Sequence, residues 1–388
     1  MSNIPYSRQD ISEADIQAVV DVLRSDYLTQ GPAVPAFETA IKEYCNATYA
    51  IATNSATSSL HIACLALGVG SGDIVWTSPI TFVASSNCAL YCGASIDFVD
   101  IDIDTYNMSI NVLEQKLVHA EKSGQLPKVI IPVHLCGQPC EMEKIHTLSK
   151  KYGFKIIEDA SHAIGAKYKN EPIGNCKFSD ITIFSFHPVK IITTGEGGMA
   201  TTNCPQLANK MQLLRTHGIT RDENLMTKSS DGPWYYEQID LGFNYRMSDI
   251  QAALGLSQFN RLDAFVSKRH EIAKRYNDLF EPIFFSTQTN IEDAYSAFHL
   301  YVIRLSEKNI KKNHLEVFKA LKAANIDVNL HYIPVYLQPY YQQLGFEQGY
   351  CQEAENYYKS AISLPIYPSL IQSQQDFVIN SIKELCFD

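Results

Sequence analysis

The sequence predicts an α/β protein with a large, mostly parallel β-sheet and a smaller α+β region toward its C-terminal end. Three observations predict this class. Short runs rich in Ile and Val alternate with stretches of helical periodicity between about residues 50 and 186. A long helical pattern begins near Met247 and runs, with a break, to Leu279, and a new strand–helix–strand pattern follows Ser286. The length of 388 residues also exceeds that of one ordinary domain.

The large sheet is predicted to contain six strands, each a short apolar run: 49–53, 74–77, 96–99, 129–134, 155–158 and 181–184. Helical periodicity connects them over 56–67, 82–91, 112–122 and 142–152. Strands that alternate with helices pair in parallel through right-handed crossovers. In the C-terminal region we expect a strand at 299–305, a helix at 315–323 and a strand at 327–331. The predicted division is an N-terminal segment 1–30, a large domain 31–262 and a small domain 263–388.

Composition and charge exclude one broad class of function. Hydrophobic residues make up 46% of the chain and charged residues 19%, which is typical of a globular protein with a large core. Lys and Arg total 32 against 42 Asp and Glu, so the formal net charge is −10. Because general nucleic-acid binding depends on a basic surface, no nucleic-acid partner is predicted.

Neither a membrane protein nor an exported protein is predicted. Segments 44–72 and 74–96 lack charged residues and are long enough to cross a bilayer, but their many polar residues, Gly and Pro favour buried α/β structure. Residues 1–10 show no secretory signal, so we expect a cytoplasmic protein with reduced cysteines. The 10 cysteines do not form the doubled Cys-x-x-Cys pattern of a zinc site, and no metal site is predicted.

Ligands of open α/β sheets bind beyond the carboxyl ends of the strands, so candidate site residues are sought there. The first predicted strand is followed by Asn54-Ser55-Ala56-Thr57-Ser58. Small and hydroxylated residues at a helix start leave backbone N–H groups free to bind a phosphate, although an ordinary helix N-cap is the alternative. The glycine-rich segment 68–72 follows a helix and precedes a strand, which is the wrong order for a dinucleotide-binding motif and predicts a turn.

Two later strand ends supply a carboxylate and an amine. Asp159 continues an apolar run, while Glu158 points to the opposite side of the strand. A carboxylate below a ligand ring can keep a pyridine nitrogen protonated. Lys190 lies in an apolar, glycine-punctuated stretch, where burial lowers an amine's pKa and favours bonding to an aldehyde; a lysine that extends to solvent is the alternative. Ser185 lies five residues upstream and could add a hydroxyl to the phosphate site.

Two further segments carry polar or aromatic groups. The loop 242–249 precedes the long helical pattern, and its Ser248 predicts an N-cap, but a polar loop there is also suited to reach across a subunit interface. The segment 331–334 lies in an aromatic-rich run. Most of these rings are predicted to form the core of the small domain, and one or two could stack on a nucleobase.

Taken in chain order, a phosphate-binding helix start, a strand-end Asp and a Lys are the parts that pyridoxal 5′-phosphate requires. The phosphate needs hydroxyl and N–H donors, the ring nitrogen needs Asp159, and the aldehyde needs Lys190. The predicted architecture is therefore the aspartate-aminotransferase-like fold, fold type I of the enzymes that depend on this cofactor.

A series of motifs then follows the chain, in the order Leu28-Thr29-Gln30-Gly31-Pro32, Asn54-Ser55-Ala56-Thr57-Ser58, Glu158-Asp159-Ala160-Ser161-His162-Ala163-Ile164-Gly165, Ser185-Phe186-His187 with Lys190, Gly195-Glu196-Gly197-Gly198, Asn244-Tyr245-Arg246 and His331-Tyr332. In this order the series resembles the DegT/DnrJ/StrS sugar aminotransferases over nearly the whole chain. Within the family, the likeness is to enzymes of pseudaminic acid biosynthesis, which aminate a UDP-linked 4-keto-6-deoxy-N-acetylhexosamine.

The resemblance implies roles for the cofactor-binding residues. Lys190 is expected to bond to the cofactor and then to move the proton between substrate and cofactor, and Asp159 to pair with the ring nitrogen. The phosphate is expected to be held by Ala56, Thr57 and Ser185. Three further positions match cofactor contacts of the family: Phe82 on the ring face, His162 on the ring-hydroxyl side, and Asn244, which reaches the phosphate from the second subunit of a homodimer.

The resemblance also implies a substrate site, to which the segment 1–30 contributes. The expected substrate-binding residues are Tyr6, Asp26, Tyr27, Leu28, Thr29, Ala56, Ser185, Asn244, Arg246, His331, Tyr332, Ile333 and Pro334. The expected amino donor is L-glutamate, and Arg246 is a candidate partner for its carboxylate.

Three other functions stay open. The substrate could be another nucleotide 4-keto sugar, of the bacillosamine or perosamine type. A sugar dehydratase of the same fold is disfavoured, since members of that kind carry His where Lys190 stands. A non-enzymatic regulator or binding module built on the fold would be free to lose Asp159 or Lys190, and this chain retains both.

Overall fold

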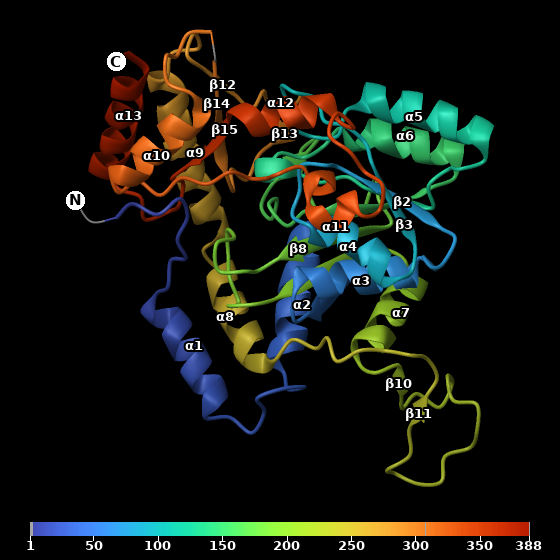
Figure 1. Ribbon diagram of the computed structural model, residues 1–388. Coiled ribbons are helices and arrows are strands. Elements are labelled where there is room, and N and C mark those ends of the chain that lie inside the picture. Colours follow the sequence, from blue (N-terminus) through green and yellow to red (C-terminus); the bar gives the residue numbers. More distant parts are fainter. Residues whose placement is uncertain (1–2, 307, 388) are drawn as a thin grey trace.

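A seven-stranded sheet organises the large part of the computed structural model, which describes residues 3–306 and 308–387 (Figure 1). The strand order is β1-β9-β8-β5-β4-β2-β3. The strands are β1 (Tyr49–Thr53), β2 (Ile74–Thr77), β3 (Ser95–Phe98), β4 (Val129–Ile131), β5 (Lys155–Asp159), β8 (Ile181–Ser185) and β9 (Gly198–Thr202). β9 pairs antiparallel with both neighbours, and the other neighbouring strands pair in parallel. The prediction of a mostly parallel sheet is confirmed.

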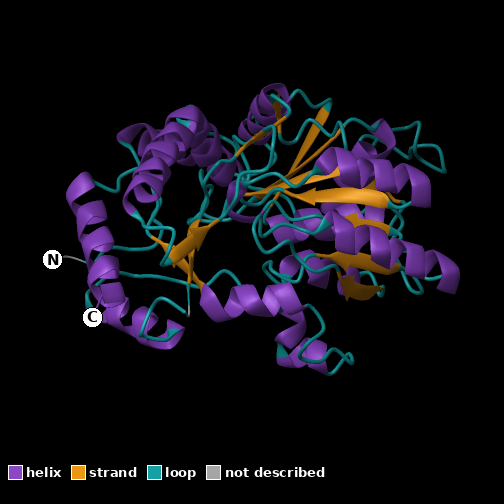
Figure 2. Ribbon diagram, turned by 90° about the horizontal axis from the view of Figure 1, so that it is seen from above, coloured by secondary structure: helices purple, strands orange, loops and turns teal. Residues whose placement is uncertain are grey.

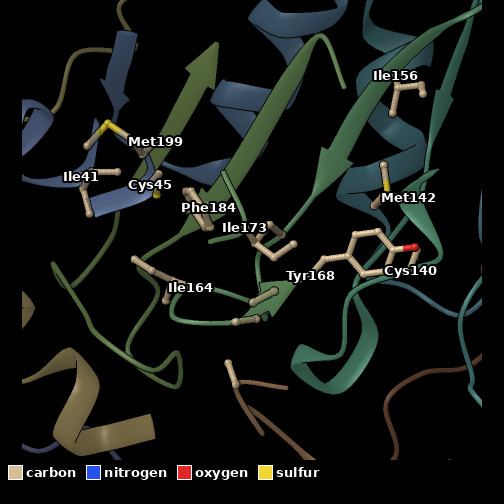
Figure 3. Close-up of a cluster of buried hydrophobic side chains, with 14 of the residues drawn as sticks. Ile41, Cys45, Cys140, Met142, Ile156, Ile164, Tyr168, Ile173, Phe184 and Met199 are labelled. Atoms are coloured by element: carbon tan, nitrogen blue, oxygen red, sulfur yellow. The ribbon is translucent and has the colours of Figure 1, made fainter. Parts of the chain in front are cut away.

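Helices cover both faces of this sheet. Figure 2 shows the sheet as a layer between them. One face packs on α2 (Ala33–Cys45), α5 (Ile110–Ser123), α6 (Met142–Tyr152) and α8 (Asp249–Phe259). The other packs on α3 (Ala56–Ala66), α4 (Ala84–Tyr91) and α7 (Pro205–Arg215). Side chains of the first core, among them Met142, Ile156 and Phe184, are seen together in Figure 3.

The pleat of β5 decides which side of the sheet carries the candidate acid. Ile156 belongs to the core under α5 and α6, whereas Ile157 belongs to the core under α3 and α4. Because successive side chains alternate between faces, Glu158 follows Ile156 and Asp159 follows Ile157. Asp159 therefore points to the α3 and α4 side, and the predicted opposition of Glu158 and Asp159 is found.

A second, three-stranded antiparallel sheet forms the C-terminal region, with β14 (Tyr301–Leu305) between β12 (Phe285–Thr287) and β15 (Ala361–Leu364). Its core lies against α9 (Leu262–Leu279), α10 (His314–Ala323) and α13 (Gln372–Phe387). The first turns of α9 bury Phe265 in the large core, and its later turns bury Tyr276 in the small one. One helix thus joins the two cores, and the division at residue 262 stays a prediction.

Smaller elements complete the described chain: α1 (Glu13–Leu23), α11 (Pro339–Gln342), α12 (Gln352–Ser360), the 3-10 helices η1 (Leu135–Gly137) and η2 (Val335–Leu337), and the short strands β6 (Lys167–Tyr168), β7 (Glu171–Pro172), β10 (Ile219–Thr220), β11 (Glu237–Gln238) and β13 (Ala294–Tyr295). The β10–β11 hairpin and the loop between its strands project from the body in Figure 1. Within the described part of the chain, no helix combines the length and apolarity that crossing a bilayer requires.

Several predicted elements need correction. The expected strand 327–331 is not formed; Asn329 makes only an isolated bridge to Ser363 of the edge strand β15. The strand predicted to reach residue 134 ends at Ile131, just before Pro132, which has no N–H to donate to a neighbouring strand. β9 was not predicted, because its sequence Gly-Met-Ala-Thr-Thr lacks a long apolar run. The break in the long helix falls at Asn260 and Arg261, between α8 and α9.

Candidate active site

The start of α3 forms an anion-binding corner. Ser55 is the N-cap, and its side chain accepts a hydrogen bond from the Ser58 N–H at 3.1 Å. The first turn of a helix leaves N–H groups without partners inside the helix, and those of Ala56 and Thr57 belong to this turn. The helix dipole adds a partial positive charge at this end. The corner can therefore bind a phosphate, as the sequence predicted.

Ser185 is brought to the same edge by strand register. It ends β8 and pairs with Gly198 of β9, which in turn pairs with Thr53 at the end of β1. A Cβ on Gly198 would lie 2.5 Å from the backbone N of Ala56, so only glycine lets the α3 start approach β9 this closely. Ser185 at the end of β8 and the α3 start, which follows β1, thus lie at the same end of the sheet on either side of β9.

Asp159 is buried at the end of β5 with both carboxylate oxygens engaged. The Ser85 hydroxyl donates to Oδ2 at 2.6 Å, and the backbone N–H of Ser161 donates to Oδ1 at 3.1 Å. These two donors fix the plane of the carboxylate.

Glu158 serves a different purpose on the opposite face. It is buried, and His134 Nε2 donates to its Oε2 at 2.8 Å while the Thr182 hydroxyl donates to Oε1 at 3.0 Å. The Cys140 N–H donates to Nδ1 of His134, which leaves the imidazole proton on Nε2. Burial alone would raise the pKa of Glu158, but the hydrogen bond from His134 and those from hydroxyl groups lower it. Glu158 is a buried structural carboxylate that anchors β5.

Lys190 lies in the loop after β8, where it is half-buried. Its backbone N–H donates to the carbonyl oxygen of His187 at 2.9 Å. Burial lowers the pKa of the Lys190 amine to about 8, while the negative charge of Asp159 acts in the opposite direction. An amine with this pKa exchanges its proton close to neutral pH, as a nucleophile and acid–base group must.

Three buried histidines lie close enough to Lys190 for its charge to affect them. Burial, followed by the charge of Lys190, lowers the pKa of His162 well below the usual range, and the same two causes lower the pKa of His331 to about 3. For His299, burial and the neighbouring His162 lower the pKa, and Lys190 adds to the effect. All three imidazoles are therefore neutral at pH 7. The charge that acts on the Lys190 amine is that of Asp159.

Aromatic rings line the same space. The His162 and His299 ring centroids are 4.4 Å apart, and the Tyr332 hydroxyl lies 3.3 Å from Nε2 of His162. The ring centroids of Phe82 and Tyr332 are 6.3 Å apart, and 59% of the Phe82 surface is exposed. The Phe82 ring is therefore free to cover a planar ligand. The sequence predicted Phe82, His162 and Tyr332 at the site, and the structure brings these three together.

The predicted sugar-binding residues fall into two groups. Tyr6 packs on His331 with ring centroids 5.2 Å apart, next to the histidine cluster. Ile333 is exposed and Pro334 is buried beside it. The segment Asp26, Tyr27, Leu28 and Thr29 is exposed throughout, and it is tied to α8 by the Asp249 N–H, which donates to the Leu28 carbonyl at 3.0 Å.

Asn244 and Arg246 lie on the loop before α8. The backbone oxygen of Asn244 accepts from Asn54 Nδ2 at 3.4 Å, immediately before the α3 start, while its side chain is exposed. Arg246 lines a pocket of about 200 Å³ with Gln30, Gly31, Val34, Pro35, Arg215, Thr216 and Met247. None of these pocket residues belongs to the cluster around Lys190. Within one chain, Arg246 therefore lies apart from that cluster.

Two residues of the site were missed by sequence reasoning. Ser85 contacts Asp159 from α4, and the His299 ring packs on the His162 ring, in a tilted arrangement, from the chain before β14. Neither carries a sequence signal: Ser85 lies 74 residues from its partner, and His299 begins an ordinary apolar run. Among the described residues, no group of three or more His, Cys, Asp or Glu side chains is arranged to hold a metal ion.

The site fits pyridoxal 5′-phosphate. The buried Nδ1 atoms of His162 and His299 have no hydrogen-bond partner among the described residues, although buried polar atoms are normally paired. They lie near Lys190, whose pKa is lowered, and Asp159, whose carboxylate is held in place. Ser185 and the α3 start can bind the phosphate. This donor set matches the aldehyde, ring nitrogen, ring hydroxyl and phosphate of that cofactor.

A family comparison agrees with this chemistry. Residues 9–383 match the model of the DegT/DnrJ/EryC1/StrS aminotransferase family. The chain belongs to this family. Enzymes of this family depend on pyridoxal phosphate, and the chain is accordingly a sugar aminotransferase that uses this cofactor.

Individual relatives cover the whole chain. A UDP-4-amino-4,6-dideoxy-N-acetyl-beta-L-altrosamine transaminase of Campylobacter jejuni is 39% identical over 98% of this chain and 96% of its own. The structure of Helicobacter pylori PseC, an aminotransferase involved in the biosynthesis of pseudoaminic acid, superposes with a TM-score of 0.91 at 31% identity and covers all of both chains. The PLP form of the putative sugar aminotransferase Spr1654 from Streptococcus pneumoniae superposes with a TM-score of 0.88 at 31% identity, over 99% of both chains.

Proposed function

We propose that this aminotransferase moves an amino group from L-glutamate to C4 of a UDP-linked 4-keto-6-deoxy-N-acetylhexosamine, UDP-2-acetamido-2,6-dideoxy-β-L-arabino-hex-4-ulose, in pseudaminic acid biosynthesis. The observation that carries the proposal is the Lys190–Asp159 pair beside the α3 anion corner. The likeness to the altrosamine transaminase and to PseC supports the choice of sugar. Cytoplasmic location stays a prediction.

Pyridoxal phosphate, when bound, supplies an aldehyde carbon and an electron-withdrawing ring. Asp159, oriented by the Ser85 hydroxyl and the Ser161 N–H, would pair with the ring nitrogen. Lys190 would hold the cofactor through its amine and would move the proton from the donor's carbon. Its pKa of about 8 suits both tasks, because the neutral amine is the nucleophile and the proton acceptor.

The surroundings of Lys190 favour this proton movement. His162, His299 and His331 are neutral and place no competing positive charge around the amine. Their burial also excludes bulk water from one side of the site, which keeps the proton on groups that the chain positions. His162, through its unpaired Nδ1 or its Tyr332 contact, is proposed to bind the ring-hydroxyl side of the cofactor.

The sugar nucleotide is proposed to lie between Tyr6, the segment 26–29 and the segment 331–334. Tyr6 and His331 already pack together at the edge of the Lys190 cluster. The exposed segment 26–29 and the pocket of Arg246 are proposed to serve the site of a second subunit in a homodimer, with Asn244 reaching its phosphate. This arrangement accounts for Arg246 lying outside the cluster of its own chain.

The experiment separates candidate sugars. The enzyme is first converted by L-glutamate to its pyridoxamine form, and 2-oxoglutarate is removed. The C5-epimeric UDP-4-keto-6-deoxy-N-acetylhexosamines, L-arabino and D-xylo, are then added separately, and the return of the pyridoxal absorbance is followed. Return with only the L-arabino epimer is the expected result. Return with only the D-xylo epimer would overturn the sugar assignment in favour of a bacillosamine-type substrate and leave the cofactor chemistry intact.

A further inference from the structure

A buried cation lies where the two cores of the chain meet. Arg269 is on α9, between Phe265 in the core of the large sheet and Tyr276 in the core of the small sheet, and only 1% of its surface is exposed. Within the described residues, Arg269 takes no part in the ion pairs that arginines form. Burial of a charge without a partner of opposite charge is costly, so other groups must stabilise the guanidinium.

Backbone carbonyl groups supply this stabilisation. The Nη1 group of Arg269 donates to the carbonyl oxygens of Phe298 at 3.2 Å, His299 at 3.1 Å and Ile366 at 2.9 Å. Phe298 and His299 precede β14, whereas Ile366 follows β15. One guanidinium therefore ties two segments of the small sheet to the helix that joins the two cores.

The segment before β14 has a backbone that needs such support. Phe298 has a φ of 45°, in the left-handed region that a bulky side chain rarely adopts. The neighbouring Ala297 N–H donates to the carbonyl of Gly137 in η1 at 3.0 Å. A backbone of this kind persists only where its surroundings fix it. The Arg269 guanidinium on one side and η1 on the other therefore fix where the His299 side chain lies.

The His299 ring leads directly to the cofactor site. It is 2% exposed, and its centroid is 4.4 Å from that of the His162 ring. Nε2 of His162 lies 3.3 Å from the Tyr332 hydroxyl. His162 is thus enclosed between His299 and Tyr332. A binding side chain keeps its geometry only when the residues behind it are themselves held, so the place of His162 depends on the place of the His299 backbone.

A second path leads from Ile366 to the loop of Lys190. The Ile366 N–H donates to the carbonyl of Tyr6 at 3.1 Å, and the hydroxyl of the next residue, Ser7, donates to the Val189 carbonyl at 3.0 Å. Val189 directly precedes Lys190. The guanidinium therefore holds the backbone that supports both the histidines on one side of the site and the reactive amine on the other.

We propose that Arg269 is a positioning residue of this aminotransferase. It holds His299 against His162 on one side of the site and, through Ile366 and the N-terminal segment, steadies the loop of Lys190 on the other. It acts through these groups and does not itself touch the cofactor or the substrate. The proposal rests on the role proposed for His162 at the cofactor, and it does not depend on the identity of the sugar.

The test measures binding of pyridoxal phosphate to the full-length apoenzyme. Arg269→Lys keeps a positive charge but loses the planar fork of donors, whereas Arg269→Gln keeps a planar donor without the charge. Fluorescence titration gives the Kd, and thermal unfolding of the same samples gives the Tm. We expect both variants to raise the Kd about ten-fold, the effect of losing an outer group that orients the ligand of a metal site.

Tyr276→Phe is the matched control. The Tyr276 hydroxyl is buried on the same helix and donates to the Pro365 carbonyl at 2.9 Å, so its loss weakens the contact of α9 with the chain after β15. It makes no hydrogen bond to the segment of His299. We expect this variant to lower the Tm and to leave the Kd unchanged.

A double-mutant comparison shows whether Arg269 acts through His299. His299→Ala should also raise the Kd, and in Arg269→Lys/His299→Ala the rise should be well below the product of the two single effects, since both residues lie on one path. An unchanged Kd in the Arg269 variants, an equal rise in Tyr276→Phe, or single effects that multiply would each overturn the proposal. The sugar nucleotide is not used, so a wrong sugar assignment would leave these results valid.

Discussion

The hydroxyl of Ser85 lies 2.6 Å from Oδ2 of Asp159 and ties helix α4 to the end of strand β5. The Ser161 N–H holds the other carboxylate oxygen at 3.1 Å. Asp159 thus has a fixed orientation before any ligand arrives. Fixed dipoles that need no reorganisation are the form in which electrostatic groups contribute most to catalysis.

Removing the Ser85 hydroxyl is expected to lower the activity of the enzyme without unfolding it. In Ser85→Ala, Asp159 loses one of two donors, and we expect kcat to fall about ten-fold, the cost of one hydrogen bond to a charged group. Steady-state kinetics measures the effect. The matched control is Ser86→Ala on the same helix, whose hydroxyl lies 2.6 Å from the Tyr341 hydroxyl and contacts no site residue named above. Equal losses in the two variants would contradict the role of Ser85.

The close approach of β9 to the α3 start predicts a strong effect of a single methyl group. In Gly198→Ala, the added Cβ would meet the Ala56 N at 2.5 Å and push the helix start away from Ser185. We expect the Kd for pyridoxal phosphate to rise at least about ten-fold, through lost phosphate contacts. Fluorescence titration of the apoenzyme measures this Kd. Gly70→Ala is the control, because a Cβ there meets nothing within 4 Å, and it should leave the Kd unchanged.

The pKa of Lys190 predicts how cofactor capture depends on pH. Only the neutral amine bonds to an aldehyde, so the rate of capture by the apoenzyme should rise with pH through a midpoint near 8. Stopped-flow absorbance measures the rate. Since the charge of Asp159 raises the pKa of Lys190, Asp159→Asn should move the midpoint to lower pH. A midpoint near 10.5, the ordinary pKa of a lysine amine, in the unmodified enzyme would contradict the burial of this amine.

The proposed sharing of the site between subunits is tested by mixing two inactive variants. Lys190→Ala and Asn244→Ala homodimers each lack one part of every site. If Asn244 serves the neighbouring subunit, the mixed dimer contains one intact site, and random exchange should restore roughly a quarter of full activity. Each variant mixed with itself is the control. Mixtures that stay inactive after exchange is verified by native mass spectrometry would place Asn244 in the site of its own chain.

Sequence reasoning found the parts of the site that local patterns report. Asp159, Ser185 and the α3 start each follow a recognisable strand, and Lys190 lies in an unusual apolar stretch, so their types and order predict the cofactor. Ser85 and His299 depend on packing between segments far apart in the chain, which no local period reports. Strand β9 was missed, and a strand was wrongly predicted at 327–331, for the same reason. Whether a segment becomes a strand depends on its pairing with strands that lie far away in the sequence.

The central claim is that Lys190 carries the cofactor in the site formed by Asp159, Ser185 and the start of α3. Borohydride reduction of the holoenzyme fixes pyridoxal phosphate permanently to whichever lysine it is bonded to, and peptide mass spectrometry then locates it. We expect the pyridoxyl group on Lys190 alone, and no stable attachment in Lys190→Ala. Attachment to another lysine in the unmodified enzyme, with Lys190 unlabelled, would contradict the account.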